Sequence, residues 1–499
     1  MSITGPGSVT AANIAAQTNM MNELNKLAEQ LGTGQMAQTY SELQSQAGMV
    51  LGLNSQLAAI NGYSNTISTV NTTLSIAQSS LTTLGTLSGD VQGEVTDKPG
   101  FSLNSTGQTT VQVAAASQLD EILSILNTQV GNNYIFSGSA VNQPAVASTS
   151  AILNGTGAQA GLTQIISERQ QADLGTTGMG RLSVATAGST VTLSQDGTPF
   201  GFQLTGVTSA LNGATATGPS GSPPSISVAL ASNPNDGDTV SFQLTLPDGS
   251  TQTLSLQATS SSTPGTGQFS IGTTPAATAT NLQNALSSAI TNLAQTQLPA
   301  ASAMEAGNNF FSEPPQIVVP GAGNNYATAT SLTNGTAANT VIWYTGENGA
   351  TPARQTQSAL VGPSTTIDYG MRANEQGITN LVKNVAVLAA TMFSPSNPNA
   401  KDTYLALSNK VEINLTTPSG SQSIDDIESD IANAQTTVSN ATKLNTQTQT
   451  TVNDILNNVD GVNQNQIAEK ILTLQNSLSA SMSVSVRLSQ LSLVNYLTH

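Results

Sequence analysis

Residues 60–84, INGYSNTISTVNTTLSIAQSSLTTL, decide how this chain is organised. Their apolar positions alternate in steps of three and four residues, the spacing of a helix that packs lengthwise against others in a coiled coil. The flanking positions are mostly Ser, Thr, Asn and Gln, so interhelical ion pairs do not select the partner. We expect a helix over residues 42–91, with an apolar stripe made of Ile60, Tyr63, Ile67, Val70, Leu74, Ala77, Leu81 and Leu84.

A second helix is expected over residues 110–130, and a matching stripe recurs near the C-terminus. Ser423 is the expected N-cap of that C-terminal helix, with Asp426 three residues later. A break is expected near Asp460-Gly461, after which an apolar pattern continues to the end. The stripe before the break is Ile424, Ile427, Ile431, Ala434, Val438, Ala441, Asn445, Thr448, Val452, Ile455 and Val459.

Neither terminal region can bury its apolar stripe alone. The sequence therefore predicts an α+β fold with a long antiparallel N- and C-terminal coiled-coil helical bundle and a large inserted β-rich head domain. The expected segments are an N-terminal helical region (1–140), the inserted head (141–345), a return segment with helices (346–420) and a C-terminal helical region (421–499) that pairs with the first.

The head is expected to be β-rich because Gly, Ser and Thr separate short alternating apolar patterns. The sequence predicts one hairpin at PDGS (247–250) and a similar one at SQDG (194–197). One helix, over 280–294, is expected among these strands, and another over 374–392 after them. The pair Trp343-Tyr344 is expected to mark a strand in the core.

Composition excludes several functions. The chain has no cysteine, its only histidine is His499, and only 8% of its residues are charged, against about 25% in ordinary globular chains. The usual general base and metal ligands are therefore missing. The net charge of −16 argues against nucleic acid as a partner. We expect a protein that is not an enzyme and has no cofactor or metal.

Three polar segments could form catalytic or cation-binding sites, but each has a simpler structural interpretation. The acidic residues at 425–430 fit the start of a helix, where carboxylates oppose the helix dipole. NPNDGD at 233–238 lacks the glycine spacing and closing glutamate of a calcium loop, so a turn is expected. ISERQQADLG at 166–175 is expected to be an ion-paired turn.

The last nineteen residues, SMSVSVRLSQLSLVNYLTH (481–499), are unusually apolar for a chain end. Such a patch usually marks an interaction surface. The longest apolar run, residues 385–392, is far shorter than the ~20 residues of a membrane span, so no membrane insertion is expected. The first residues do not have the pattern of a cleaved secretion signal.

Four stretches resemble the bacterial flagellin superfamily, and within it the hook–filament junction branch. They are TNMMNELNKLAEQLGTGQ (18–35), LNTQVGNNYIFSG (126–138), DYGMRANEQGITNLVKNVAVLAA (368–390) and VRLSQLSLVNYL (486–497). The sequence departs from the family pattern after Gln35, where MAQTYSEL replaces the usual basic residue and Ser-Asp-Asp-Pro turn.

The resemblance implies a structural axial protein of the bacterial flagellum, joining hook to filament. It implies an extracellular location after type III export without a cleaved signal, with a cytoplasmic export chaperone holding the disordered termini. The implied partners are further copies in a ring or filament layer, another hook-associated protein, and flagellin. The implied partner-binding residues are Met20, Met21, Leu24, Leu27, Leu31, Leu478, Met482, Leu488, Leu491, Val494, Tyr496 and Leu497.

Two other functions stay open at this point. A filament flagellin of the same fold would share the helical ends and differ in copy number. A secreted adhesin or hydrolase would instead use the β-rich head, and residues 141–345 alone would then bind a glycan or turn over a substrate.

Overall fold

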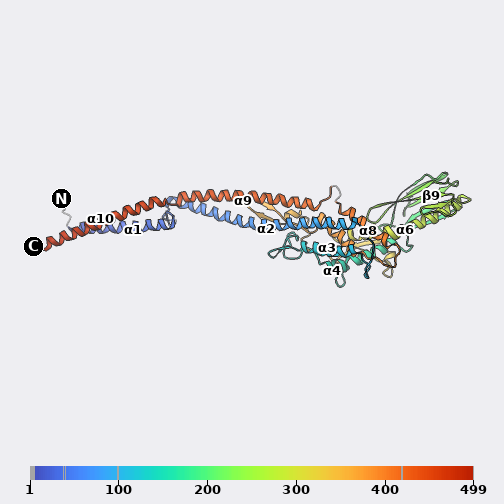
Figure 1. Cartoon of the computed structure of the whole chain (residues 1–499), viewed down its shortest axis with the longest axis horizontal. Helices are drawn as coiled ribbons and strands as arrows, with labels where there is room; N and C mark the ends of the chain where they lie inside the picture. The colour runs from blue at the N-terminus through green and yellow to red at the C-terminus, as the bar shows by residue number, and fades with distance from the viewer. Residues whose placement is uncertain (1–5, 38, 40, 98–99, 417–419, 498–499) are drawn as a thin grey trace. The chain divides into compact units, whose positions relative to one another are not determined.

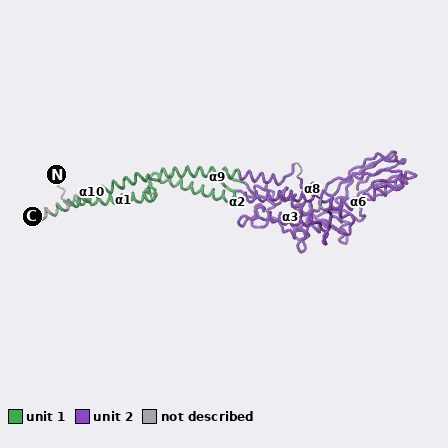
Figure 2. The backbone as a smooth tube through the Cα atoms, in the orientation of Figure 1, with its two compact units in different colours: residues 1–71, 359–367, 436–499 green, residues 72–358, 368–435 purple. Residues whose placement is uncertain are grey.

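The computed structural model describes residues 6–37, 39, 41–97, 100–416 and 420–497, and it combines terminal helices with a central β-rich region (Figure 1). The chain forms two compact units (Figure 2). Unit 1 comprises Met1–Asn71, Ala359–Ile367 and Thr436–His499, and unit 2 comprises Thr72–Ser358 and Asp368–Gln435. The long helices α2 (Ala47–Asp97) and α9 (Ile424–Asp460) contribute residues to both units.

In unit 1, helix α1 (Pro6–Thr33) packs against helix α10 (Gln464–Leu497). The Gln17 amide donates to Ser481 Oγ at 3.3 Å and to Ser485 Oγ at 3.0 Å, while Gln35 forms an isolated β-bridge with Gly461. Low residue numbers in α1 therefore lie beside high residue numbers in α10, so the two helices run antiparallel.

The stripe at residues 60–84 faces inward as expected. Six of its large side chains are at most 6% exposed and Ala77 is fully buried, while Tyr63 is half-buried. Helix α2 begins at Ala47, after a short 3-10 turn (Gln44–Gln46), so the expected start at residue 42 was five residues early. In unit 1, Gln449 of α9 donates to Asn61 of α2 at 3.0 Å.

Helix α9 begins with the expected cap. The Ser423 backbone N–H donates to Asp426 Oδ2 at 2.8 Å, and the Asp426 N–H donates back to Ser423 Oγ at 3.1 Å. This reciprocal pair satisfies two donors that the first turn of a helix leaves free. The expected break at Asp460-Gly461 is also confirmed, because α9 ends at Asp460 and α10 starts at Gln464.

One position of the C-terminal stripe was assigned wrongly. Ile455 is 40% exposed, and the neighbouring Leu456 packs with Val459 against a small cluster instead. That cluster holds Ala37, Leu43 and Val50. The residues between α1 and α2 thus add a local core that shifts the buried face of α9 by one residue, which a regular three-four spacing cannot reveal.

The polar residue Asn445 in the same stripe is buried for a specific reason. It is 5% exposed, and its side-chain amide donates to the Val361 carbonyl at 3.0 Å. Val361 lies between the strands β13 (Ser358–Leu360) and β14 (Thr366–Asp368), and its N–H donates to the Thr365 carbonyl at 2.9 Å. Asn445 therefore anchors this hairpin to α9 within unit 1.

We expect Asn445→Ala to loosen the hairpin, because an unpaired buried carbonyl costs about 1–3 kcal/mol. Hydrogen exchange at the Val361 amide should accelerate by roughly tenfold or more, since local opening sets its protection. Gln447→Ala, at an exposed position of the same helix, is the control and should leave exchange unchanged. Equal exchange in both variants would show that the Asn445 bond does not hold the hairpin.

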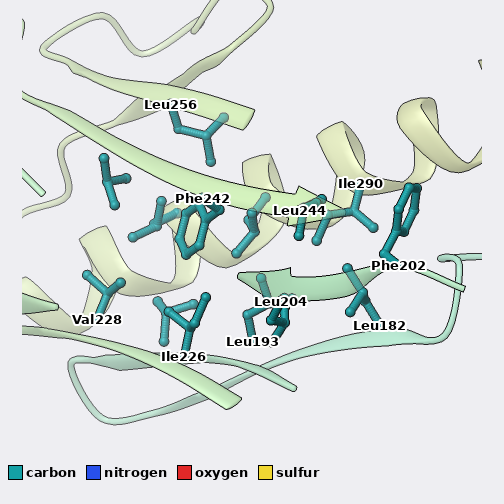
Figure 3. Close-up of a cluster of buried hydrophobic side chains, with 14 of the residues drawn as sticks. Leu182, Leu193, Phe202, Leu204, Ile226, Val228, Phe242, Leu244, Leu256 and Ile290 are labelled. Carbon is teal, nitrogen blue, oxygen red and sulfur yellow. The ribbon is translucent and has the colours of Figure 1, made fainter. Parts of the chain in front are cut away.

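Unit 2 contains two four-stranded sheets, with strand orders β3-β4-β7-β6 and β10-β9-β8-β5. Side chains from both sheets and from helix α6 (Pro275–Phe310) point into a common interior (Figure 3). The strands are β3 (Leu182–Ala187), β4 (Thr190–Gln195), β5 (Gln203–Ser209), β6 (Ala214–Ser220), β7 (Ser225–Leu230), β8 (Thr239–Thr245), β9 (Thr251–Thr259) and β10 (Gln268–Ser270).

Of the two expected hairpins, one is confirmed and one is wrong. The PDGS turn joins β8 to β9, in a register that pairs Thr245 with Thr251. The SQDG turn joins β4 to β5, but these strands belong to different sheets. Both edges of β4 are already occupied by β3 and β7, so β5 pairs with β8 instead.

Helix α6 is much longer than the expected 280–294, because its buried face continues past Pro299. Thr274 caps its first turn, and Ala301, Ala303 and Met304 remain buried beyond the proline. Segment 166–175 is not a turn: it lies almost wholly in helix α5 (Leu162–Leu174), where Arg169 and Asp173 form an ion pair. Turn structure at 233–238 is confirmed.

The remaining elements complete unit 2. Helix α3 ends at residue 126 instead of 130, because a short hairpin follows it. Trp343 and Tyr344 are buried as expected, but they do not lie in a strand: Tyr344 forms an isolated β-bridge. The elements are α3 (Thr110–Leu126), β1 (Gln129–Val130), β2 (Asn133–Tyr134), α4 (Thr149–Asn154), β11 (Gln316–Val319), 3-10 turns at Tyr326–Thr328 and Ala353–Thr356, β12 (Ser331–Asn334), α7 (Gln376–Ala390) and α8 (Ala400–Leu415).

Candidate assembly surface

Exposed apolar side chains gather on unit 1. Of the sixteen large apolar side chains that are exposed among the described residues, twelve belong to unit 1, which holds less than a third of the chain. Scattered single exposures are normal in a soluble protein, but this concentration is not. They are Ile14, Met21, Met36, Met49, Leu51, Leu360, Leu444, Ile455, Leu472, Met482, Val484 and Val486.

Helix α10 carries four of these side chains. Leu472 is 62% exposed and Val486 is 56% exposed, with Met482 and Val484 between them. A shallow depression of about 650 Å³ runs over this helix, and all of its described lining residues, including Leu478, Met482 and Val486, come from α10 itself. No other part of the described chain covers this depression, so it is open to a second molecule.

The structure divides the predicted partner-binding residues of α1 into two groups. Leu27 is buried, and Met20, Leu24 and Leu31 are half-buried, whereas Met21 is 48% exposed. The half-buried and buried residues contribute to packing within unit 1, because α1 lies against α10. Met21 remains available at the surface.

The predicted residues of α10 divide in the same way. Leu478 is half-buried and Met482 is 44% exposed. The side chains of Leu488, Leu491, Val494, Tyr496 and Leu497 lie outside the part of the chain that the structure describes, although the backbone of these residues belongs to α10.

The antiparallel register indicates which predicted residues are neighbours. The Gln17–Ser481 contact and the Gln35–Gly461 bridge place Leu24 and Leu27 about level with Leu474 and Ile471. Residues near 20 come level with Leu478.

Sequence reasoning missed Leu472 as a surface residue. It lies beside Ile471 in sequence, one position off the apolar three-four stripe. A leucine on the outer face of a helix can itself indicate a contact surface, because two helices that pack only against each other bury one apolar face each.

Three acidic residues near the start of α9 each interact with a different partner. Asp426 belongs to the cap, and its hydrogen bonds with Ser423 lower the pKa of the carboxyl. Glu428 accepts hydrogen bonds from Gln78 and from Thr82, the latter at 2.9 Å. Asp430 lies 3.7 Å from the Arg354 guanidinium. Among the described residues, no three acidic or histidine side chains gather where a metal ion could bind.

None of the helices within the described ranges is long and apolar enough to span a bilayer. Comparison with models of known protein families and with curated proteins gave no match to this chain.

Proposed function

We propose that this chain is a structural axial protein of the bacterial flagellum, which joins hook to filament through polymerisation of its terminal helices. In this proposal the terminal helices form an antiparallel coiled-coil bundle, and copies assemble into a ring or filament layer outside the cell. Another hook-associated protein and flagellin are the neighbours, and a cytoplasmic chaperone holds the termini before export.

The concentration of exposed apolar side chains on unit 1 is the observation that carries this proposal. Burying apolar surface contributes about 25 cal/mol per Å², so repeated contacts over two long helices would stabilise an assembly. The four stretches that resemble the flagellin superfamily support the specific identity, and two of them, 18–35 and 486–497, overlap the terminal helices α1 and α10.

A filament flagellin of the same fold is the second candidate, favoured by the same surface. Copy number separates the two functions: a flagellin dominates sheared filaments, whereas a junction protein is a trace component. Electron microscopy of cells that lack the protein gives a second criterion. Hooks without filaments, with flagellin lost to the medium, are expected for the junction role.

A point substitution tests the surface directly. Leu472→Asp introduces a charge at a position that is 62% exposed in the single chain, so its folding stability should change by only about 0.5 kcal/mol. An unpaired charge buried between subunits would be costly. We expect incorporation into flagella to fall at least tenfold, measured by quantitative immunoblotting of sheared flagella.

The matched control is Ser477→Asp, which adds the same charge to an exposed polar position of α10 that lies about 140° around the helix from Leu472. It should assemble as the parent does. If Leu472→Asp also assembles as the parent does, the outer face of α10 is not a subunit contact and the proposal loses its physical support.

A further inference from the structure

Unit 2 contains a polar cleft that the proposed assembly does not use. Its volume is about 940 Å³, near the upper end of the range of small-molecule sites. The β8–β9 turn, helices α6, α7 and α8, and residues 421–422 form its walls. Residues from Asp248 to Gln422 in sequence are thus brought together around one space.

The lining is rich in carboxamides and balanced in charge. Nine of its side chains are Asn or Gln, and four more carry hydroxyl groups. Its two lysines, Lys383 and Lys410, are matched by two carboxylates, Asp248 and Glu313. A ligand that fits this lining is uncharged and offers many donors and acceptors.

Several of these amides are free to bind. Among the described residues, the side chains of Gln252, Gln297, Asn409 and Asn414 have no hydrogen-bond partner. They come from three separate elements, β9, α6 and α8. Each carboxamide can donate and accept at the same time, as each hydroxyl of a sugar can.

The two lysines do not form an anion site. Lys410 is buried and donates to Asp248 Oδ2 at 2.6 Å and to Ser250 Oγ at 2.7 Å. Lys383 donates to Asn308 Oδ1 at 3.0 Å, so its ammonium also has a partner within the cleft. A phosphate ligand would also face the carboxylates of the cleft.

We propose that this cleft binds a neutral carbohydrate, with the free amides hydrogen-bonding the sugar hydroxyls. Ile413 at the cleft is 61% exposed and offers an apolar surface to the C–H face of a pyranose ring. The cleft needs α7 and α8, so residues 141–345 alone do not contain it. No described residue of α1, α2, α9 or α10 lines it, and neither proposal depends on the other.

The test uses the full-length protein and three neutral trisaccharides, chitotriose, maltotriose and xylotriose, with inorganic phosphate as the anionic comparison. Isothermal titration and saturation-transfer NMR should detect saturable binding of at least one sugar below ~10 mM, and none of phosphate. The double variant Gln252→Ala/Asn409→Ala should bind that sugar at least tenfold more weakly.

The matched control is Asn284→Ala, which removes an exposed helical Asn of the same unit that lies outside the cleft. It should bind the sugar as the parent does, and circular dichroism should be the same for every variant. Three outcomes would overturn the proposal: no sugar binds, phosphate binds in place of the sugars, or the double variant binds with unchanged affinity.

Discussion

A chain without residues 480–499 is expected to lose assembly completely while unit 2 stays folded. The deletion removes Ser481 and Ser485, which hold Gln17 of α1, and the exposed residues Met482, Val484 and Val486. It therefore removes both the pairing of α1 along this stretch and much of the apolar face of α10. None of the deleted residues belongs to unit 2.

Two measurements on the truncated chain separate assembly from folding. Immunoblotting of isolated flagella should find the parent protein and no truncated protein. Trp343, the only tryptophan of the chain, is buried in unit 2, so its fluorescence should be unchanged. Deleting only Thr498 and His499, which follow the last residue of α10, is the control and should permit assembly. Normal incorporation of the truncated chain would refute the assignment of the surface.

Local periodicity was sufficient to predict most of α2 and α9, though not the full length of α6. The stripe at residues 60–84 and the cap at Ser423 depend only on neighbours within a few turns, and both are as expected. The glycine at 461 likewise marked the end of α9. These features follow from backbone geometry and from the need to bury one face of a helix.

The pairing and packing of segments that are distant in sequence could not be predicted. The SQDG turn has the composition of a hairpin, but strand pairing was decided by β7 and β8, which lie further along the chain. The shift from Ile455 to Leu456 depends on a cluster contributed by Ala37 and Val50. In each case the deciding residue is hundreds of positions away or in another strand, where spacing carries no information.

The polar cleft was also invisible in the sequence. Its amides are spread from Gln252 to Gln422, and Asn and Gln form much of the surface of this charge-poor chain. No single one of them stands out by type. Only the folding of α6, α7 and α8 around the β8–β9 turn shows which amides converge.

Loss of Arg169 is expected to give the largest change in stability of unit 2. Arg169 Nε donates to Asp173 Oδ2 at 2.8 Å, and both side chains are almost fully buried. The guanidinium also lies over the Phe200 ring, 5.1 Å from its centroid. Arg169→Met would leave a buried carboxylate without its cation, which costs about 3–5 kcal/mol. Urea unfolding followed by Trp343 fluorescence measures the change.

The pH dependence of stability and a second substitution show whether the lost ion pair causes the loss of stability in Arg169→Met. Burial raises the pKa of the Asp173 carboxyl, and Arg169 opposes this rise. In Arg169→Met the folded-state pKa therefore rises further, so stability is retained at low pH and lost as pH increases through that pKa. The free energy of unfolding of Arg169→Met should therefore fall well below that of the parent at pH 7 and be close to it near pH 4. Asp173→Asn, combined with Arg169→Met, should recover most of the loss at pH 7, because the amide oxygen can still accept from the Gly201 N–H. A deficit that is equal at both pH values, or that the second substitution does not reduce, would show that lost packing on Phe200 dominates and that the ion pair does not.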